Sequence, residues 1–176
     1  MTVDVLAIGA HPDDIEICCG GTLAQMARAG RRVGILHLTS GEAGTRGTTA
    51  ERRREAAQAA EILGAQELEF LALGDGALRT GPEEEDQVIA ILRRMRPELI
   101  LGPATVDRHP DHERAHTLVA AACFYAGLAR RVGHALPRVA GTDRPYPAPA
   151  LGFGQQRHGV GGAAQLVGVD RLQVFQ

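Results

Sequence analysis

The stretch Val3–Asp14, VDVLAIGAHPDD, sets a pattern that much of the chain repeats. Its first part, Val3–Ile8, is a short and mostly apolar run that ends at Gly9, which is typical of a strand buried inside a parallel sheet. The polar segment His11–Asp14 follows at once and predicts a loop at the end of that strand. In α/β sheets, ligands bind beyond the carboxyl ends of the strands, so this loop is a candidate site.

Strand-like and helix-like segments alternate along the first two thirds of the chain. Further strands are predicted at Val33–Leu38, Glu67–Leu73 and Leu99–Gly102. Helices are predicted from Gly20 to about Ala29, from Ala50 to Leu63 with Thr49 as its cap, from Pro82 to Arg96, and from about Pro110 to Ala129. This alternation predicts a Rossmann-like, doubly wound α/β fold, with a mostly parallel sheet and helices on both faces.

The composition changes near residue 141. Residues 1–140 are predicted to form the catalytic α/β domain, and residues 141–176 an irregular tail of the same domain that is rich in proline and glycine. Only Leu166–Val169 and Leu172–Phe175 have the character of strands in that tail.

Charge and composition exclude several classes of protein. The 176 residues carry a net charge of -2, which gives no electrostatic footprint for nucleic acid. No run of about 18 apolar residues and no signal peptide is present, so we expect neither a membrane span nor export, and a cytoplasmic location. All 19 basic residues are arginine, which excludes a Schiff-base or P-loop lysine. The sequence also lacks asparagine, a heat-labile residue, as expected from a thermophilic source or from genome base composition.

Two histidine-containing loops predict a metal site. His11–Asp14 (HPDD) follows the first strand, and His109–His112 (HPDH) follows the fourth, so both loops fall on the same edge of a parallel sheet. Imidazoles and carboxylates are ligands that zinc accepts. In the first loop, His11 and one aspartate are expected to bind the metal, which leaves the other aspartate for acid/base chemistry.

Other interpretations of the same residues remain open. The aspartates of both loops are also common as helix caps. His112, Glu113 and His116 fit the H-E-x-x-H motif of zinc peptidases, although a helix start at Pro110 and a doubly wound fold do not suit that family. His37 is predicted to be a core or near-site residue. The Gly74-Asp75-Gly76 segment is predicted to be a turn or part of a substrate loop.

Three segments resemble one family. HPDDIEICCGGTLA (from His11), GTTAERRREAAQAAEILGA (from Gly47) and RHPDHERAH (from Arg108) are similar to segments of the PIG-L/LmbE family of zinc-dependent N-acetylglucosaminyl deacetylases, which includes the deacetylases of mycothiol and bacillithiol synthesis. The resemblance covers roughly residues 3–130 and implies a homo-oligomer that acts on a small-molecule N-acetyl sugar or sugar conjugate.

The resemblance also implies a metal centre. His11, Asp14 and His112 match the family's metal ligands. Three protein ligands leave zinc an open position for water. Zinc is the expected cofactor, and another divalent ion such as iron would accept the same ligands.

The remaining site residues are assigned by the same resemblance. Asp13 matches the general base, and His109 matches the residue that stabilises the oxyanion or protonates the leaving amine, with Asp111 orienting His109. Arg52 is the best match for the substrate-contacting arginine, although Arg53 is adjacent. The tail departs from the family pattern. A metal-binding protein with an incomplete pocket and no turnover is therefore an alternative to the deacetylase, as is the less favoured peptidase.

Overall fold

The computed structural model describes residues 1–128, 131 and 150–153 of the chain. In this part of the chain the strands form one five-stranded sheet in the order β3-β2-β1-β4-β5, and every pairing is parallel. The strands are β1 (Val5–Gly9), β2 (Val33–His37), β3 (Glu67–Phe70), β4 (Leu99–Gly102) and β5 (Ala150–Phe153). The predicted α/β fold class is confirmed.

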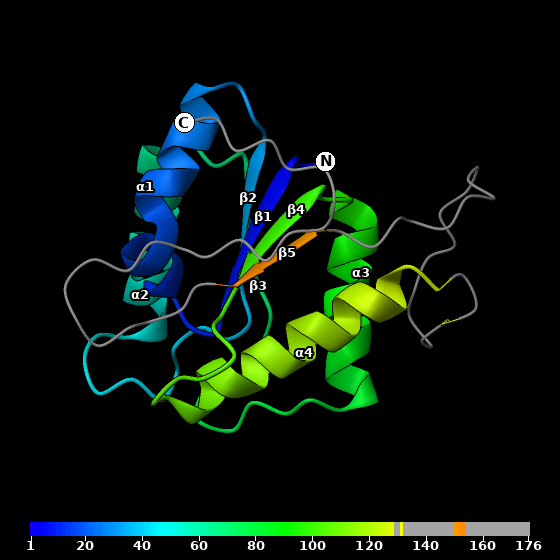
Figure 1. The fold of residues 1–176 in the computed structure, drawn as a ribbon. Coiled ribbons are helices and arrows are strands. Elements are labelled where there is room, and N and C mark those ends of the chain that lie inside the picture. Colours follow the sequence, from blue (N-terminus) through cyan, green and yellow to red (C-terminus); the bar gives the residue numbers. More distant parts are fainter. Residues whose placement is uncertain (129–130, 132–149, 154–176) are drawn as a thin grey trace.

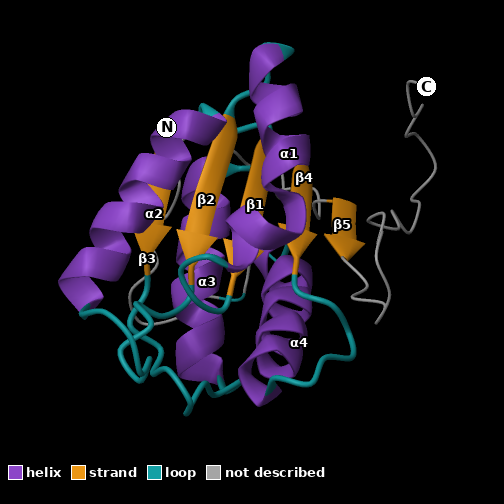
Figure 2. Ribbon diagram, turned by 90° about the vertical axis from the view of Figure 1, so that its left-hand side faces the viewer, coloured by secondary structure: helices purple, strands orange, loops and turns teal. Residues whose placement is uncertain are grey.

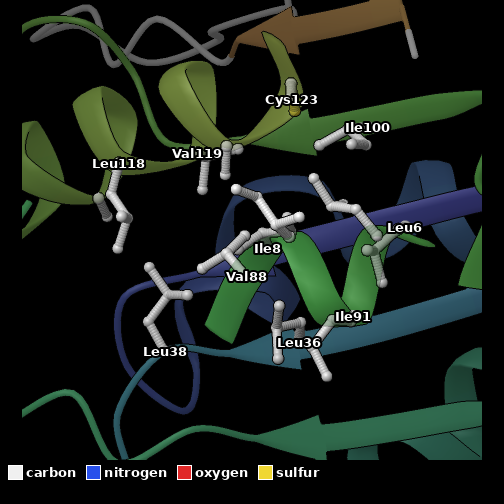
Figure 3. Packing of buried hydrophobic residues seen from close by; sticks show 14 of the residues in the cluster. Leu6, Ile8, Leu36, Leu38, Val88, Ile91, Ile100, Leu118, Val119 and Cys123 are labelled. Atoms are coloured by element: carbon white, nitrogen blue, oxygen red, sulfur yellow. The ribbon is translucent and has the colours of Figure 1, made fainter. Parts of the chain in front are cut away.

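Helices cover both faces of the sheet (Figure 1). The helices are α1 (Asp14–Arg28) and α2 (Thr49–Leu63) on one face, and α3 (Pro82–Met95) and α4 (Pro110–Ala126) on the other. A hydrophobic core lies on each side of the sheet. The larger one, in Figure 3, brings Leu6 and Ile8 of β1 together with Val88 of α3 and Val119 of α4. Burial of this kind contributes about 25 cal/mol for each Å² of apolar surface.

The central strands are buried on both faces, which explains why their sequences are apolar apart from His37 at the end of β2. Every residue of β1 and β2 is buried. Gly34 has no side chain at a crowded position of β2, because a Cβ there would lie 3.2 Å from side-chain atoms of Leu6 and Val3. Two central strands covered on both sides form a rigid base for the loops at their carboxyl ends.

Several predicted boundaries were wrong. The first helix begins at Asp14 rather than Gly20, and Gly20 lies inside it, where an added Cβ would be at an ordinary van der Waals distance of 3.4 Å from Leu63 of α2. Thr48, not Thr49, caps α2 and forms a capping box with Glu51.

The other differences lie at element ends and in the tail. β3 ends at Phe70 rather than Leu73, and α4 ends at Ala126. Four residues of the tail predicted to be irregular form β5, which pairs with β4. The strand-like segments predicted at 166–169 and 172–175 lie outside the described residues.

The strand order places the topological switch point, where doubly wound sheets have their ligand crevice, between β1 and β4. The chain leaves β1 through α1 to one face of the sheet and leaves β4 through α4 to the other face. Adjacent loops that diverge in this way mark the ligand site of a doubly wound sheet. Figure 2 shows the strand arrowheads pointing toward the end where the long loops gather.

No helix of the described residues is long and apolar enough to cross a membrane.

Candidate active site

His11 is held by main-chain contacts with the neighbouring strand. Thr39 donates to the carbonyl of Ala10 through its N–H (3.0 Å) and through its Oγ1 (2.9 Å). The fully buried His37 places Nδ1 3.1 Å from the His11 carbonyl oxygen. Burial lowers the pKa of His37 to about 4, so its ring is neutral and donates from Nδ1. His37 therefore fixes the main chain of the His11 loop through this hydrogen bond.

Asp13 has an unusual backbone conformation. It lies at the N-terminal cap of α1 with φ 93°, in the left-handed region that aspartate tolerates better than most residues. Its side chain makes no cap hydrogen bond and is exposed. Partial burial and then the Asp14 carboxylate raise the pKa of Asp13, while Arg52 acts in the opposite direction. The Asp13 carboxylate is therefore free to exchange a proton.

The second histidine loop is shaped by the start of α4. Pro110 occupies the first turn of the helix, and His109 is its cap. Nδ1 of His109 accepts the main-chain N–H of Asp111 at 3.2 Å. In the neutral ring, Nε2 of His109 then carries the hydrogen. The His109 ring stacks on His112 (4.7 Å between centroids) and meets the edge of His11 (4.8 Å).

Asp14 lies between the imidazoles of the two loops. Its Oδ1 is 3.2 Å from Nε2 of His112, and its Oδ2 is 3.6 Å from Nδ1 of His11. The three predicted metal ligands, His11, Asp14 and His112, are thus brought together across the crevice between β1 and β4.

The second ring nitrogen of His11 and that of His112 face further carboxylates. Nδ1 of His112 lies 3.1 Å from Asp107, and Nε2 of His11 lies 3.1 Å from Asp75 and 3.3 Å from Asp111. Histidines that bind metals through one nitrogen usually donate the other N–H to a carboxylate or carbonyl. The donor chemistry therefore fits a divalent cation.

The described residues contain two groups of three side chains with suitable ligand spacing, and Asp14 belongs to neither of them. Ligand atoms of His11, His109 and His112 lie within 4.8 Å of one another, as do those of His11, Asp75 and Asp111. His109 is thus a geometric alternative to Asp14 as the third donor.

Negative charge dominates the electrostatics of the site. Five carboxylates surround three imidazoles: Asp13, Asp14, Asp75, Asp107 and Asp111. Hydrogen bonds from His11 and His112 overcome burial and lower the pKa of Asp14. The Asp14 hydrogen bond is also the main reason why the pKa of His112 is raised to about 9. An excess of carboxylates at closely spaced donors favours a bound cation.

A comparison with protein families matches residues 6–123 to PIG-L, described as GlcNAc-PI de-N-acetylase. This match spans more than half of the chain and includes both histidine loops. The chain belongs to the PIG-L family.

Individual relatives extend this result. The chain is 35% identical to the diacetylchitobiose deacetylase of Thermococcus kodakarensis over 85% of its own length and 58% of that protein. Among solved structures it resembles the conserved protein TT1542 from Thermus thermophilus, with 40% identity, a TM-score of 0.78, and coverage of 86% of this chain and 66% of that one.

The same fold also supports another chemistry. GalB, the 4-carboxy-2-hydroxymuconate hydratase from Pseudomonas putida KT2440, is 28% identical with a TM-score of 0.71, and the match covers 89% of this chain and 66% of that one. In each of these three comparisons the chain spans less than two thirds of the length of the matched protein.

The structure changes the expected role of Asp111 in the PIG-L site. Its carboxylate contacts Nε2 of His11 and accepts the N–H of Gly76 (2.6 Å), and only its main-chain N–H reaches His109. Asp111 thus contacts His109 through its main chain, because the first turn of α4 directs its side chain inward, where it is 1% exposed.

The H-E-x-x-H interpretation finds no geometric support. Nδ1 of His116 lies 3.1 Å from the carbonyl oxygen of Pro103, and a carboxylate oxygen of Glu113 accepts the N–H of Asp107 at 3.2 Å. Neither residue belongs to a ligand group within the described part of the chain.

Sequence reasoning missed two of the outer carboxylates. Asp107 received no role, although it stands two residues before His109, and Asp75 was assigned only to a turn or substrate loop. The position of both residues after strands, at the carboxyl edge of the sheet, was the available signal.

Proposed function

We propose that this PIG-L family chain is a metal-dependent N-deacetylase of an N-acetylglucosamine-type sugar or sugar conjugate. The observation that carries the proposal is the exposed carboxylate of Asp13, which makes no cap hydrogen bond and lies beside the donors His11, Asp14 and His112. The family match and the deacetylase relative support the reaction class.

His11, Asp14 and His112 would hold the metal, which we propose to be zinc or another divalent ion such as iron. Asp14 is preferred over His109 because its two oxygens face both histidines, at 3.6 and 3.2 Å, whereas His109 is exposed. When bound, such an ion polarises an amide carbonyl and lowers the pKa of a water molecule toward about 7.

The protein groups then complete amide hydrolysis. Asp13 accepts a proton from water as the water oxygen attacks the acetyl carbonyl carbon. Nε2–H of His109 donates to the carbonyl oxygen as that oxygen gains negative charge. Protonated Asp13 returns the proton to the amide nitrogen, the C–N bond breaks, and acetate and a free amine leave. His109 acts in this scheme as the oxyanion donor, one of its two expected roles.

We propose that Arg52 contacts the sugar. Its Nη2 donates to the Arg46 carbonyl at 3.2 Å, but its buried Nε has no hydrogen-bond partner among the described residues. Arg53 is instead committed to Ser40 (Nη2 to Oγ, 2.8 Å) and lies over the ring of Phe70. The positive charge of Arg52 lies close enough to Asp13 to lower its pKa.

Arg52→Ala is expected to raise KM by about 10-fold to 100-fold, since a hydrogen bond from a charged group contributes about 1.5–3 kcal/mol. Metal content should not change. Arg54→Ala, an exposed arginine of the same helix, is the matched control. Steady-state kinetics that show unchanged KM for Arg52→Ala would remove this contact from the proposal.

Acetate release tests the function directly. The purified chain, loaded with Zn²⁺ or Fe²⁺, is expected to release acetate from N-acetylglucosaminides such as diacetylchitobiose, and to lose activity on chelation. Stoichiometric metal without acetate release from any member of the panel would favour the metal-binding alternative. Hydration of an unsaturated acid would favour a hydratase.

A homo-oligomeric assembly, a cytoplasmic location and a thermophilic source remain predictions, as does the division at residue 141.

A further inference from the structure

The turn after β3 carries Asp75 between two glycines, which restrict the backbone conformation little. Gly74 and Gly76 both have left-handed φ angles, 86° and 73°, and a Cβ at Gly76 would meet nothing within 4 Å. Between them, the Asp75 side chain is only 10% exposed and places Oδ1 3.1 Å from Nε2 of His11. Because glycines are flexible, contacts from outside the turn must fix this position.

Glu42 supplies such contacts from the loop after β2. Its Oε1 accepts the main-chain N–H of Asp75 at 3.0 Å, and its Oε2 accepts that of Ser40 at 2.9 Å. Asp75 reciprocates, since its Oδ2 accepts the N–H of Ala43 at 2.8 Å. Two carboxylates thus join the loops that follow β2 and β3, and one of them also reaches His11.

Asp111 holds the same turn from the opposite side. Its Oδ2 accepts the N–H of Gly76 at 2.6 Å and lies 3.3 Å from Nε2 of His11. The turn is therefore clamped between Glu42 and Asp111. Glu42 is the one of the two that makes no contact with an imidazole in the described residues.

We infer that Glu42 is a positioning residue that fixes the orientation of His11 through the Asp75 carboxylate. This inference rests on the proposed metal-dependent function. With Nε2–H of His11 donating to Asp75, the ring turns Nδ1 toward Asp14, where a metal would bind. Partners of this kind typically change metal affinity by about 10-fold to 100-fold.

The test is a metal-binding measurement on the full chain. The dissociation constant for Zn²⁺, measured by competition with a chromophoric chelator, is expected to rise about 10-fold in Glu42→Ala and at least as much in Asp75→Asn. The double variant should lose no more than Asp75→Asn alone, because Glu42 acts through Asp75. Glu51→Ala is the matched control, since in the described part of the chain that carboxylate accepts hydrogen bonds from the N–H and the hydroxyl of Thr48, away from the donor cluster.

A second variant separates positioning from misfolding. Glu42→Gln keeps the side-chain shape and one acceptor oxygen, so it should fold with an unchanged circular dichroism spectrum and show an intermediate affinity. Zinc binding by Glu42→Ala that equals that of the unaltered chain would overturn the inference. The inference would also be overturned if the loss of zinc affinity in the double variant equalled the sum of the losses, in free energy, of the two single variants. If the unaltered chain binds neither Zn²⁺ nor Fe²⁺, the proposed function fails and the Glu42 inference fails with it.

Discussion

Asp13→Asn is expected to lower the rate of deacetylation by about 10³-fold while leaving the metal content unchanged. The Asp13 carboxylate makes no cap hydrogen bond to α1, and within the residues that the structure describes it lies in no group of closely spaced donors. An amide cannot accept the proton of the attacking water, so the general base is lost. Metal binding should survive because His11, Asp14 and His112 remain.

Asparagine is the appropriate replacement at this position. Asp13 has φ 93°, and asparagine tolerates left-handed backbone about as well as aspartate, whereas alanine there would add strain. Initial rates of acetate release and metal content by atomic absorption measure the two expected outcomes. Glu113→Gln is the control, because that carboxylate lies near the site but binds the Asp107 N–H. Full activity in Asp13→Asn with loss in Glu113→Gln would revive the peptidase interpretation.

The fold was predictable because burial on both faces leaves a strong trace in sequence. β1 is a continuous apolar run and β2 is one up to His37, and Gly30 and Gly64 follow their helices with left-handed φ angles, as the ends of helices often require. The start of α1 was missed because a helix that begins within the HPDD loop has no apolar signal before Ile15. Gly20 looked like a boundary, although it lies within α1 on the side near Leu63 of α2. β5 was missed because four residues between proline-rich and glycine-rich segments show no periodicity.

Some contacts of the site follow from the arrangement of the strands, and others depend on the detailed folding of the loops. The meeting of His11 and His112 follows from strand order alone, since the loops after β1 and β4 must be neighbours. The outer carboxylates depend on how separate loops fold onto one another. The Asp75 contact requires the left-handed turn and Glu42, and the inward direction of Asp111 requires the geometry of the first turn of α4. Such contacts cannot be predicted from amino-acid composition and residue spacing.

His112→Ala is expected to remove the metal and to lower deacetylation by at least about 10³-fold, since a metal ion supplies several kcal/mol of transition-state stabilisation. His112 provides Nε2 beside Asp14 and binds Asp107 through Nδ1. Its removal therefore takes away one donor. It also leaves the Asp107 carboxylate, which is 5% exposed, without its imidazole partner, so the midpoint of thermal unfolding should fall as well.

His112→Asn distinguishes loss of the metal from loss of stability. The asparagine amide can still donate to Asp107, but no nitrogen takes the place of Nε2 opposite Asp14. We expect this variant to unfold closer to the unaltered chain and still to lack bound metal. His116→Ala is the matched control, because its Nδ1 faces the Pro103 carbonyl outside the donor cluster. Loss of metal in both His112→Asn and His116→Ala would place the cation on the helix face of the H-E-x-x-H motif, and metal retained in His112→Asn would contradict the centre formed by His11, Asp14 and His112.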